Sequence, residues 1–196
     1  MTRFFDILLS VIGLLLFSPL LILIYIIIRC GSRGPGFYKQ NRIGKGGVPF
    51  RLIKFRTMRI GSDKGRLITV GGRDTRITKV GYYLRKYKLD ELPQLWNVLK
   101  GDMSLVGPRP EVEKYVRLYT PEQLVVLNIR PGITDYASIA FSNENEILGK
   151  AENPERMYIE EIMPRKINYN LKYINNPSLK EYFKIILLTF SKIMKH

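Results

Sequence analysis

Two adjacent carboxylates, Asp90 and Glu91, stand in the stretch KLDELPQL at residues 88–95. A helix is expected to begin between Leu89 and Glu91, because Pro93 is tolerated in a first helical turn but not deep inside a helix. Both carboxylates would then lie where backbone N–H groups point outward and the macrodipole is positive. Such a place suits a phosphate group or a carboxylate that stays ionised. The alternative is that both acids are ordinary first-turn residues without a catalytic role, since acids are common at the start of a helix.

A second stretch that could do chemistry follows at residues 101–110, GDMSLVGPRP. Pro108 and Pro110 fix the backbone on either side of Arg109, and Gly107 allows a sharp turn. An arginine held rigidly on a loop is suited to bind a phosphate through two parallel hydrogen bonds. A rigid turn that carries a solvated arginine is the alternative.

The rest of the composition limits the chemistry that is available. The one cysteine, Cys30, excludes an internal disulfide and a cysteine-rich metal site. The one histidine, His196, is the last residue and a poor candidate for a catalytic base. Carboxylates, lysine, arginine and tyrosine therefore remain as the reactive groups. The formal net charge of +15 suits a polyanion or an anionic membrane surface as a partner.

A β-hairpin is expected upstream of the acidic pair. Residues 37–43 and 48–55 have the composition of two strands, and the glycine-rich residues 44–47 join them. This hairpin would carry Lys54 and Arg56 towards bound phosphates. A polar, glycine-containing loop is expected over residues 61–74.

A short helix is expected over residues 78–87, directly before the acidic pair. Arg85 lies five residues before Asp90 and is a candidate charge partner for it; an arginine that faces solvent or lipid headgroups is the alternative. Tyr82 and Tyr83 beside basic residues are compatible with nucleic-acid binding. They equally suit a membrane interface, and we expect no nucleic acid among the partners.

The longest apolar segment covers residues 4–28, and Asp6 is its only charged residue. As a helix it would be roughly 37 Å long, enough to cross a hydrocarbon core of about 30 Å. Ser18 and Pro19 interrupt it, and Pro19 is expected to kink the helix near its middle. From these residues alone a kinked spanning helix is favoured. The nine basic residues that follow up to Arg59 mark the cytoplasmic side of a membrane.

The last helix is expected to begin after Ser178, whose hydroxyl and Glu181 form a capping box. It has a broad apolar face and an opposite face rich in lysine, and it is too short and too charged to span a membrane. It suits a position in the plane of the membrane interface. Packing against the protein core is the alternative.

Taken together, these stretches resemble a known family. LDELPQLWNV at residues 89–98 followed by GDMSLVGPRP looks like the catalytic signature of the bacterial sugar transferases, in particular the small monotopic phosphoglycosyl transferases that begin lipid-linked glycan assembly. The similarity extends to KFRTM at residues 54–58, DTRIT at 74–78 and RPGIT at 130–134. The long spaced signature is specific, whereas any one piece would be weak.

The resemblance implies a reaction and a set of site residues. The similar enzymes move a phosphosugar from a UDP-sugar to a polyprenol phosphate such as undecaprenyl phosphate, and UMP leaves. Asp90 matches the family nucleophile, which forms an aspartyl phosphosugar. Glu91 would act beside it without covalent bonding, and Asp90 would also be a ligand of Mg²⁺. Arg109, Lys54, Arg56 and Arg85 would be the cations that bind the substrate phosphates.

The resemblance also implies an architecture. The expected fold class is α+β: a small hairpin or sheet with several helices, a re-entrant N-terminal membrane helix and interfacial amphipathic helices. Residues 1–33 would form the broken membrane helix and residues 34–196 the catalytic domain. The break at Ser18 and Pro19 matches the family's re-entrant helix, so the resemblance favours re-entry over spanning. It places the protein on the cytoplasmic face of the bacterial inner membrane, with membrane lipids as partners.

Two further functions remain as alternatives. A basic membrane-anchored protein that binds anionic lipid or nucleic acid would need no special role for Asp90. A single-pass anchor for a partner complex would place the N-terminus on the side opposite to the domain. The sequence leaves the transferred sugar and the choice between monomer and homodimer open, and residues 135–138, DYAS, depart from the family pattern.

Overall fold

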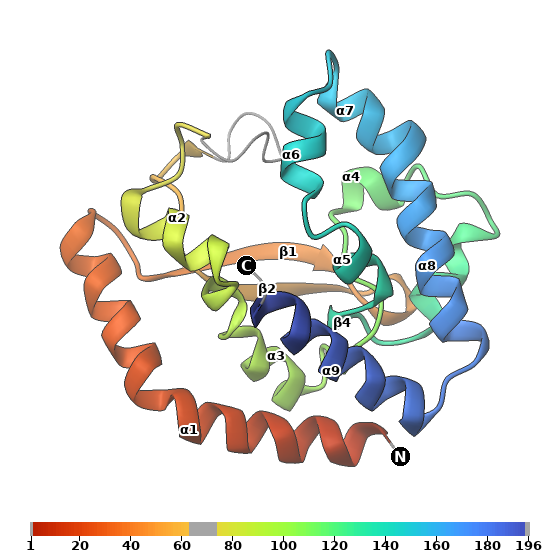
Figure 1. Cartoon of the computed structure of the whole chain (residues 1–196), viewed down its shortest axis with the longest axis horizontal. Coiled ribbons are helices and arrows are strands. Elements are labelled where there is room, and N and C mark those ends of the chain that lie inside the picture. Colours follow the sequence, from red (N-terminus) through yellow and green to blue (C-terminus); the bar gives the residue numbers. More distant parts are fainter. Residues whose placement is uncertain (1, 63–73, 195–196) are drawn as a thin grey trace.

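A computed structural model describes residues 2–62 and 74–194. Small sheets and helices combine in one chain, which confirms the α+β class in its coarser form (Figure 1). Most of the loop expected at residues 61–74, and the terminal His196, lie outside the described residues. The helices are α1 (Thr2–Gly31), α2 (Lys79–Lys86), α3 (Gln94–Lys100), α4 (Glu113–Val116), α5 (Tyr136–Ala140), α6 (Glu144–Gly149), α7 (Pro154–Met157), α8 (Met163–Asn175) and α9 (Leu179–Met194). The strands are β1 (Phe37–Ile43), β2 (Pro49–Phe55), β3 (Ser104–Val106) and β4 (Gly132–Thr134).

Strands β1 and β2 form the antiparallel hairpin that the sequence predicts, with the second strand beginning one residue later than expected. Phe37 pairs with Phe55 at the open end and Ile43 with Pro49 at the turn. The turn contains a glycine pair with positive φ, which residues with a Cβ rarely adopt. Leu52 points from β2 into a small core that α3 covers, so the hairpin and α3 hold each other in place.

Strands β3 and β4 form a parallel pair that the sequence did not reveal. Ser104 lies opposite Gly132, and Val106 lies opposite Thr134. The two backbone segments approach each other closely at Gly107 and Gly132. A Cβ on either glycine would lie 2.4 Å or less from a backbone atom of the other segment. The two signature stretches that contain these glycines are therefore joined in one structural unit.

Helix α1 is continuous through Pro19 and bends near its middle, as that proline predicts (Figure 1). The Ser18 hydroxyl donates a hydrogen bond of 2.8 Å to the carbonyl of Leu15, the group that Pro19 cannot satisfy because it has no N–H. Both arms of α1 pack against the rest of the chain. The stretch between Ser10 and Ile24 contains no buried residue.

The C-terminal half is helical and carries its own core. Leu148, Ile162 and Ile167 are fully buried in a cluster shared by α6, α8 and the π-helical turn between α7 and α8. Helix α9 begins as predicted, with the Ser178 hydroxyl accepting the Glu181 N–H at 3.1 Å. One face of α9 is buried in the core, which agrees with the core-packing alternative, while several apolar side chains of the same helix stay exposed.

Candidate active site

The acidic pair lies on a single 3₁₀ turn, Leu89–Glu91, directly before α3. The α-helix that follows this turn, α3, therefore begins at Gln94, later than the sequence predicts. Pro93 explains the difference: it has no N–H to donate to Leu89, so the Leu92 N–H bonds the Leu89 carbonyl in the tighter 3₁₀ pattern instead. Lys88 precedes the turn with a φ of 56°. This left-handed residue redirects the chain from α2 into the acidic turn.

Glu91 is held by two cations from distant parts of the chain. Arg109 binds the Glu91 carboxylate through two hydrogen bonds: Nη1 donates to Oε2 at 3.2 Å, and Nη2 donates to Oε1. Lys54 Nζ, from β2, donates to Oε1 at 3.2 Å. Burial acts to raise the pKa of Glu91, but Arg109 and Lys54 outweigh it and hold that pKa well below its ordinary value. Glu91 is therefore an ionised residue whose two oxygens are both occupied.

Asp90 lacks the hydrogen-bond partners that hold Glu91. Its side chain is buried, with 7% of the residue exposed, and none of the described residues donates a hydrogen bond to its carboxylate. Burial raises the pKa of Asp90, and the negative charge of Glu91 raises it further, while Lys54 and Arg85 act against both. Adjacent carboxylates whose surroundings shift their pKa values apart are typical of catalytic pairs with divided roles. Within the described residues, Asp90 is therefore the carboxylate of the pair that accepts no hydrogen bond.

The loop that carries Arg109 is fixed by hydrogen bonds on both sides of the arginine. The Arg109 N–H donates to Oδ2 of Asp135 at 3.1 Å, and the Gly132 N–H donates to the Pro108 carbonyl at 2.9 Å. Arg42 from β1 donates to the Pro110 carbonyl at 3.0 Å. Asp135 thus positions the backbone of Arg109, and its other oxygen accepts the Ser138 N–H and caps α5.

Arg85 also lies at the site. Its Nε donates to Oγ1 of Thr57 at 2.9 Å, and its charge lowers the pKa of Asp90. The expected neighbourhood of Arg85 and Asp90 is therefore present. The structure brings Lys54, Arg85 and Arg109 to the two carboxylates.

Arg56 is placed differently from the other predicted cations. Its guanidinium donates to the carbonyls of Ser32, at 2.9 Å, and of Arg33, both just beyond the end of α1. Carbonyls at a helix C-terminus lack intrahelical partners and attract cations. Arg56 thus ties α1 to β2, and no hydrogen bond joins it to either carboxylate of the site.

The donor groups of the site fit Mg²⁺. The described residues contain no cluster of three or more histidine, cysteine, aspartate or glutamate side chains. Magnesium does not require such a cluster, because proteins often bind it through one or two carboxylates together with substrate phosphates and water. Glu91 is occupied by Arg109 and Lys54, so Asp90 is the carboxylate that would hold the ion beside a bound diphosphate.

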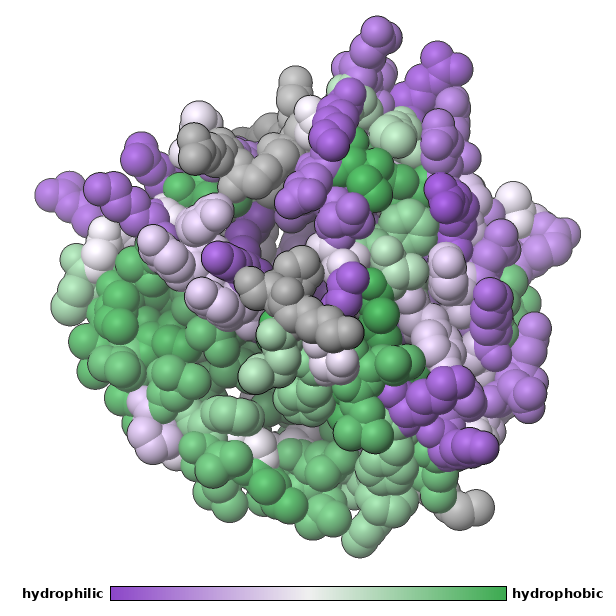
Figure 2. Space-filling view, in the orientation of Figure 1, coloured by the Kyte–Doolittle hydropathy of each residue, from purple (hydrophilic) through white to green (hydrophobic). Residues whose placement is uncertain are grey.

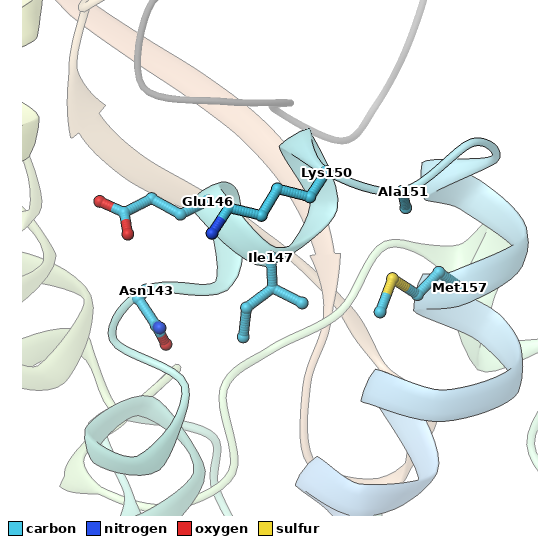
Figure 3. Close-up of a pocket in the computed structure, with 6 residues that line it drawn as sticks. All are labelled: Asn143, Glu146, Ile147, Lys150, Ala151 and Met157. Atoms are coloured by element: carbon cyan, nitrogen blue, oxygen red, sulfur yellow. The ribbon is translucent and has the colours of Figure 1, made fainter.

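Two surface cavities lie outside this group of residues. One, of about 290 Å³, lies between α6 and α7, where Asn143, Glu146 and Lys150 surround Ile147 (Figure 3). The other, of about 480 Å³, lies where α5, α8 and α9 meet and contains Tyr136 and Lys184. Neither is lined by the acidic pair or by its cations.

The chain matches the family model described as bacterial sugar transferase over residues 1–196, and it belongs to that family. It is 38% identical over 195 residues to the UDP-N-acetylgalactosamine-undecaprenyl-phosphate N-acetylgalactosaminephosphotransferase of Aeromonas hydrophila, covering 98% of this chain and 43% of that protein. It is 39% identical over 197 residues to the UDP-glucose:undecaprenyl-phosphate glucose-1-phosphate transferase of Xanthomonas campestris pv. campestris, covering 96% of this chain and 38% of that protein.

A third relative is closer to this chain in length. The UDP-glucose:undecaprenyl-phosphate glucose-1-phosphate transferase of Caulobacter vibrioides is 36% identical over 195 residues, which cover 98% of this chain and 69% of that protein. The chain therefore spans less than half of the two relatives above and about two thirds of this one. The family identified from the signature is confirmed.

Proposed function

We propose that this chain transfers a phosphosugar from a UDP-sugar to a polyprenol phosphate, with undecaprenyl phosphate as the acceptor and UMP as the leaving group. The observation that carries the proposal is the free carboxylate of Asp90 beside a Glu91 that Arg109 and Lys54 hold ionised. The names of relatives that align with almost the whole chain supply the substrate classes.

The proposed reaction has two displacements at one phosphorus atom. An oxygen of Asp90 attacks the phosphorus that bears the sugar, and the bond to the bridging oxygen breaks, so that UMP leaves with that oxygen. The product is an aspartyl phosphosugar. A phosphate oxygen of the polyprenol phosphate then attacks the same phosphorus, which restores the Asp90 carboxylate and forms a polyprenol diphosphosugar.

The cations of the site offset the repulsion between an anionic nucleophile and an anionic donor. Arg109 and Lys54 each neutralise Glu91 and present further N–H donors to a diphosphate. Arg85 adds a third positive charge near Asp90. A bound Mg²⁺ would neutralise charge on the donor's diphosphate and on the departing UMP. Glu91 fixes the two cations in position and takes no covalent bond to substrate.

A binding protein for anionic lipid or nucleic acid is the alternative. Such a protein needs exposed cations, whereas Lys54 and Arg109 are directed at a largely buried carboxylate. The test is UMP release from a panel of UDP-sugars, with and without polyprenol phosphate. We expect release with at least one sugar and none from Asp90→Asn. A protein that binds donor without releasing UMP from any member of the panel contradicts the proposal.

The alkaline side of the pH profile gives a prediction about Lys54. Burial lowers the pKa of Lys54 to about 8, although Glu91 acts to raise it. Since kcat/KM reports ionisations of the free enzyme, we expect kcat/KM to fall above about pH 8 as Lys54 loses its proton and its ion pair with Glu91. Lys54→Arg keeps the charge at these pH values, so the decline should disappear in that variant.

Loss of folding does not account for this decline. The pKa of Lys54 is about 8 in the folded protein, compared with 10.5 as its ordinary value. Between these pH values the unfolded chain binds more protons, so the contribution of Lys54 to the free energy of unfolding rises with pH. A rate profile of Lys54→Arg that still falls near pH 8 contradicts the assignment to this residue.

We also propose that α1 enters the membrane and returns by the same, cytoplasmic, face of the bacterial inner membrane. By length and composition α1 qualifies as a spanning helix. However, its two arms contact the helices and strands that follow it, namely α2, α3 and β3. Leu15 and Leu16, which lie just before the bend, are 71% and 70% exposed. Hydrophobic side chains gather along the edge formed by α1 and over part of α9, while hydrophilic ones cover the opposite edges (Figure 2).

The first arm of α1 is fixed through Asp6. This carboxylate is 2% exposed, and its Oδ1 accepts hydrogen bonds from the Ser104 hydroxyl at 2.9 Å, the Leu105 N–H at 2.9 Å and the Tyr182 hydroxyl at 2.8 Å. These partners belong to β3 and α9. Leaving a buried carboxylate without its hydrogen-bond donors destabilises the folded state. The arm therefore stays with the catalytic domain rather than on the far side of a bilayer.

The two ends of α1 are also held by arginines. At the start, Arg3 donates to the carbonyl of Leu99, at 2.9 Å, at the C-terminal end of α3. At the other end, Arg56 binds the carbonyls that follow the helix. A helix with both ends on one domain suits a re-entrant arrangement, in which the exposed bend lies in the lipid and α9 rests its exposed apolar side chains on the interface.

Thiol labelling tests this topology. Single cysteines are placed at Thr2 and at Ser62 in a Cys30→Ser background, and intact cells receive a membrane-impermeant thiol reagent. We expect neither position to label until the membrane is opened. Labelling of the Thr2 position alone would establish a spanning helix. Pro19→Leu should straighten α1 and move part of the population to that spanning form.

A further inference from the structure

Gln94, the first residue of α3, is buried, and within the described residues its amide nitrogen has no hydrogen-bond partner. The residue is 2% exposed, and its Nε2 has no partner among the residues that the structure describes. Buried amide groups are nearly always hydrogen-bonded, because leaving one unpaired destabilises the folded state. A glutamine kept in this state indicates an interaction that forms only at some stage of function.

The position of Gln94 indicates which group that interaction involves. It lies one helical turn after the acidic pair, four residues beyond Asp90 and three beyond Glu91, in a segment whose backbone is helical throughout. Glutamine and aspartate at this spacing on a helix can form a side-chain hydrogen bond. Both oxygens of Glu91 are already occupied. Asp90, which accepts no hydrogen bond within the described residues, is the acceptor in reach.

Asn97 provides a comparison on the same buried face of α3. It is fully buried and lies one turn after Gln94. Its amide accepts the Ile53 N–H at 3.0 Å and donates to the Arg51 carbonyl at 2.8 Å, so it joins α3 to β2. Asn97 therefore has a structural role, because its hydrogen bonds hold α3 against β2. Gln94 shares its burial and its helix but not these bonds.

We propose that Gln94 is a positioning residue for the nucleophile: its amide donates a hydrogen bond to the Asp90 carboxylate and orients it for attack on the donor. This inference rests on the proposed function of Asp90. The same donor can bind the carbonyl oxygen of the aspartyl phosphosugar, so it serves both displacements without taking part in bond making. It acts through Asp90 and makes no contact with the sugar.

The test separates donor binding from the chemical step. Gln94→Met keeps the length and burial of the side chain and removes the amide. In single-turnover reactions with UDP-sugar alone, we expect the rate of adduct formation to fall about tenfold to a hundredfold, the usual effect of losing a hydrogen bond to a charged group. The Kd for the donor should stay within about twofold, and the melting temperature should not fall, since an unpaired buried amide has been removed.

A matched control uses the satisfied amide. Asn97→Leu should lower the melting temperature by several degrees because it breaks bonds between α3 and β2. If Gln94→Met behaves in the same way and keeps the normal adduct rate, Gln94 is structural and the inference is wrong. Gln94→Glu, which keeps the shape but replaces the donor by a second charge next to Asp90, should also lose the adduct rate, and it serves if the Met variant does not fold. A wild-type protein that forms no adduct contradicts the function of Asp90 instead.

Discussion

Asp90→Asn is expected to reduce turnover by a factor on the order of 10³ or more, because an amide cannot replace a carboxylate as the attacking group. The variant keeps the size and burial of the side chain. It should also keep the ion pairs of Glu91 with Arg109 and Lys54, since none of them includes Asp90. Steady-state UMP release with the preferred donor and polyprenol phosphate measures the effect.

The stability of the same variant distinguishes lost chemistry from lost structure. The pKa of Asp90 is raised in the folded protein, so its ionised form contributes unfavourably to stability as the pH rises through the unfolded value towards neutrality. Asn removes this contribution, and the melting temperature at neutral pH should not decrease. Asp102→Asn, at the other end of α3, is the matched control and should retain activity. Normal turnover in Asp90→Asn would show that the nucleophile lies elsewhere.

Arg109→Lys is expected to lower kcat/KM about a hundredfold although the charge is kept. Lysine cannot reproduce the fork that joins both oxygens of Glu91, and it offers fewer fixed donors to a diphosphate. Asp135 holds the backbone at this position. The backbone therefore cannot shift to compensate for the donors that lysine lacks. Kinetics of the variant over a range of donor concentrations measure the effect.

Arg117→Lys is the control for this substitution. Arg117 also forms an ion pair with a glutamate, Glu113, but both side chains are largely exposed and the pair lies within one helical turn. Exposed pairs of this kind contribute little. Its substitution should leave activity unchanged. Full activity in Arg109→Lys would count against bidentate recognition at the site.

The parts of the fold that the sequence revealed are those with local causes. The glycines between β1 and β2 set the hairpin turn, and Thr78, where the expected helix begins, caps α2. Each of these depends on a few neighbouring residues and on backbone geometry. The signature around Asp90 and Arg109 identified the family for the same reason, since its spacing is visible along the chain.

The parts that the sequence did not reveal depend on contacts between distant segments. Nothing near Asp135 indicates that it holds the Arg109 N–H, because the two are far apart in sequence and meet only through the β3–β4 pair. The sequence predicts that Arg56, like Lys54, binds phosphates, yet its side chain reaches the end of α1. The carbonyls of Ser32 and Arg33 become visible as partners of Arg56 only when the end of α1 lies next to β2 in the fold.

The central claim is that Asp90 carries the phosphosugar between donor and acceptor. The most direct measurement is the intact mass of the protein after mixing with the UDP-sugar alone. The account predicts an added mass of one sugar phosphate less water, found in the wild type, absent from Asp90→Asn and lost when polyprenol phosphate is added. Efficient UMP release on addition of the acceptor, with no adduct formed on the protein beforehand, would instead show direct transfer and contradict the account.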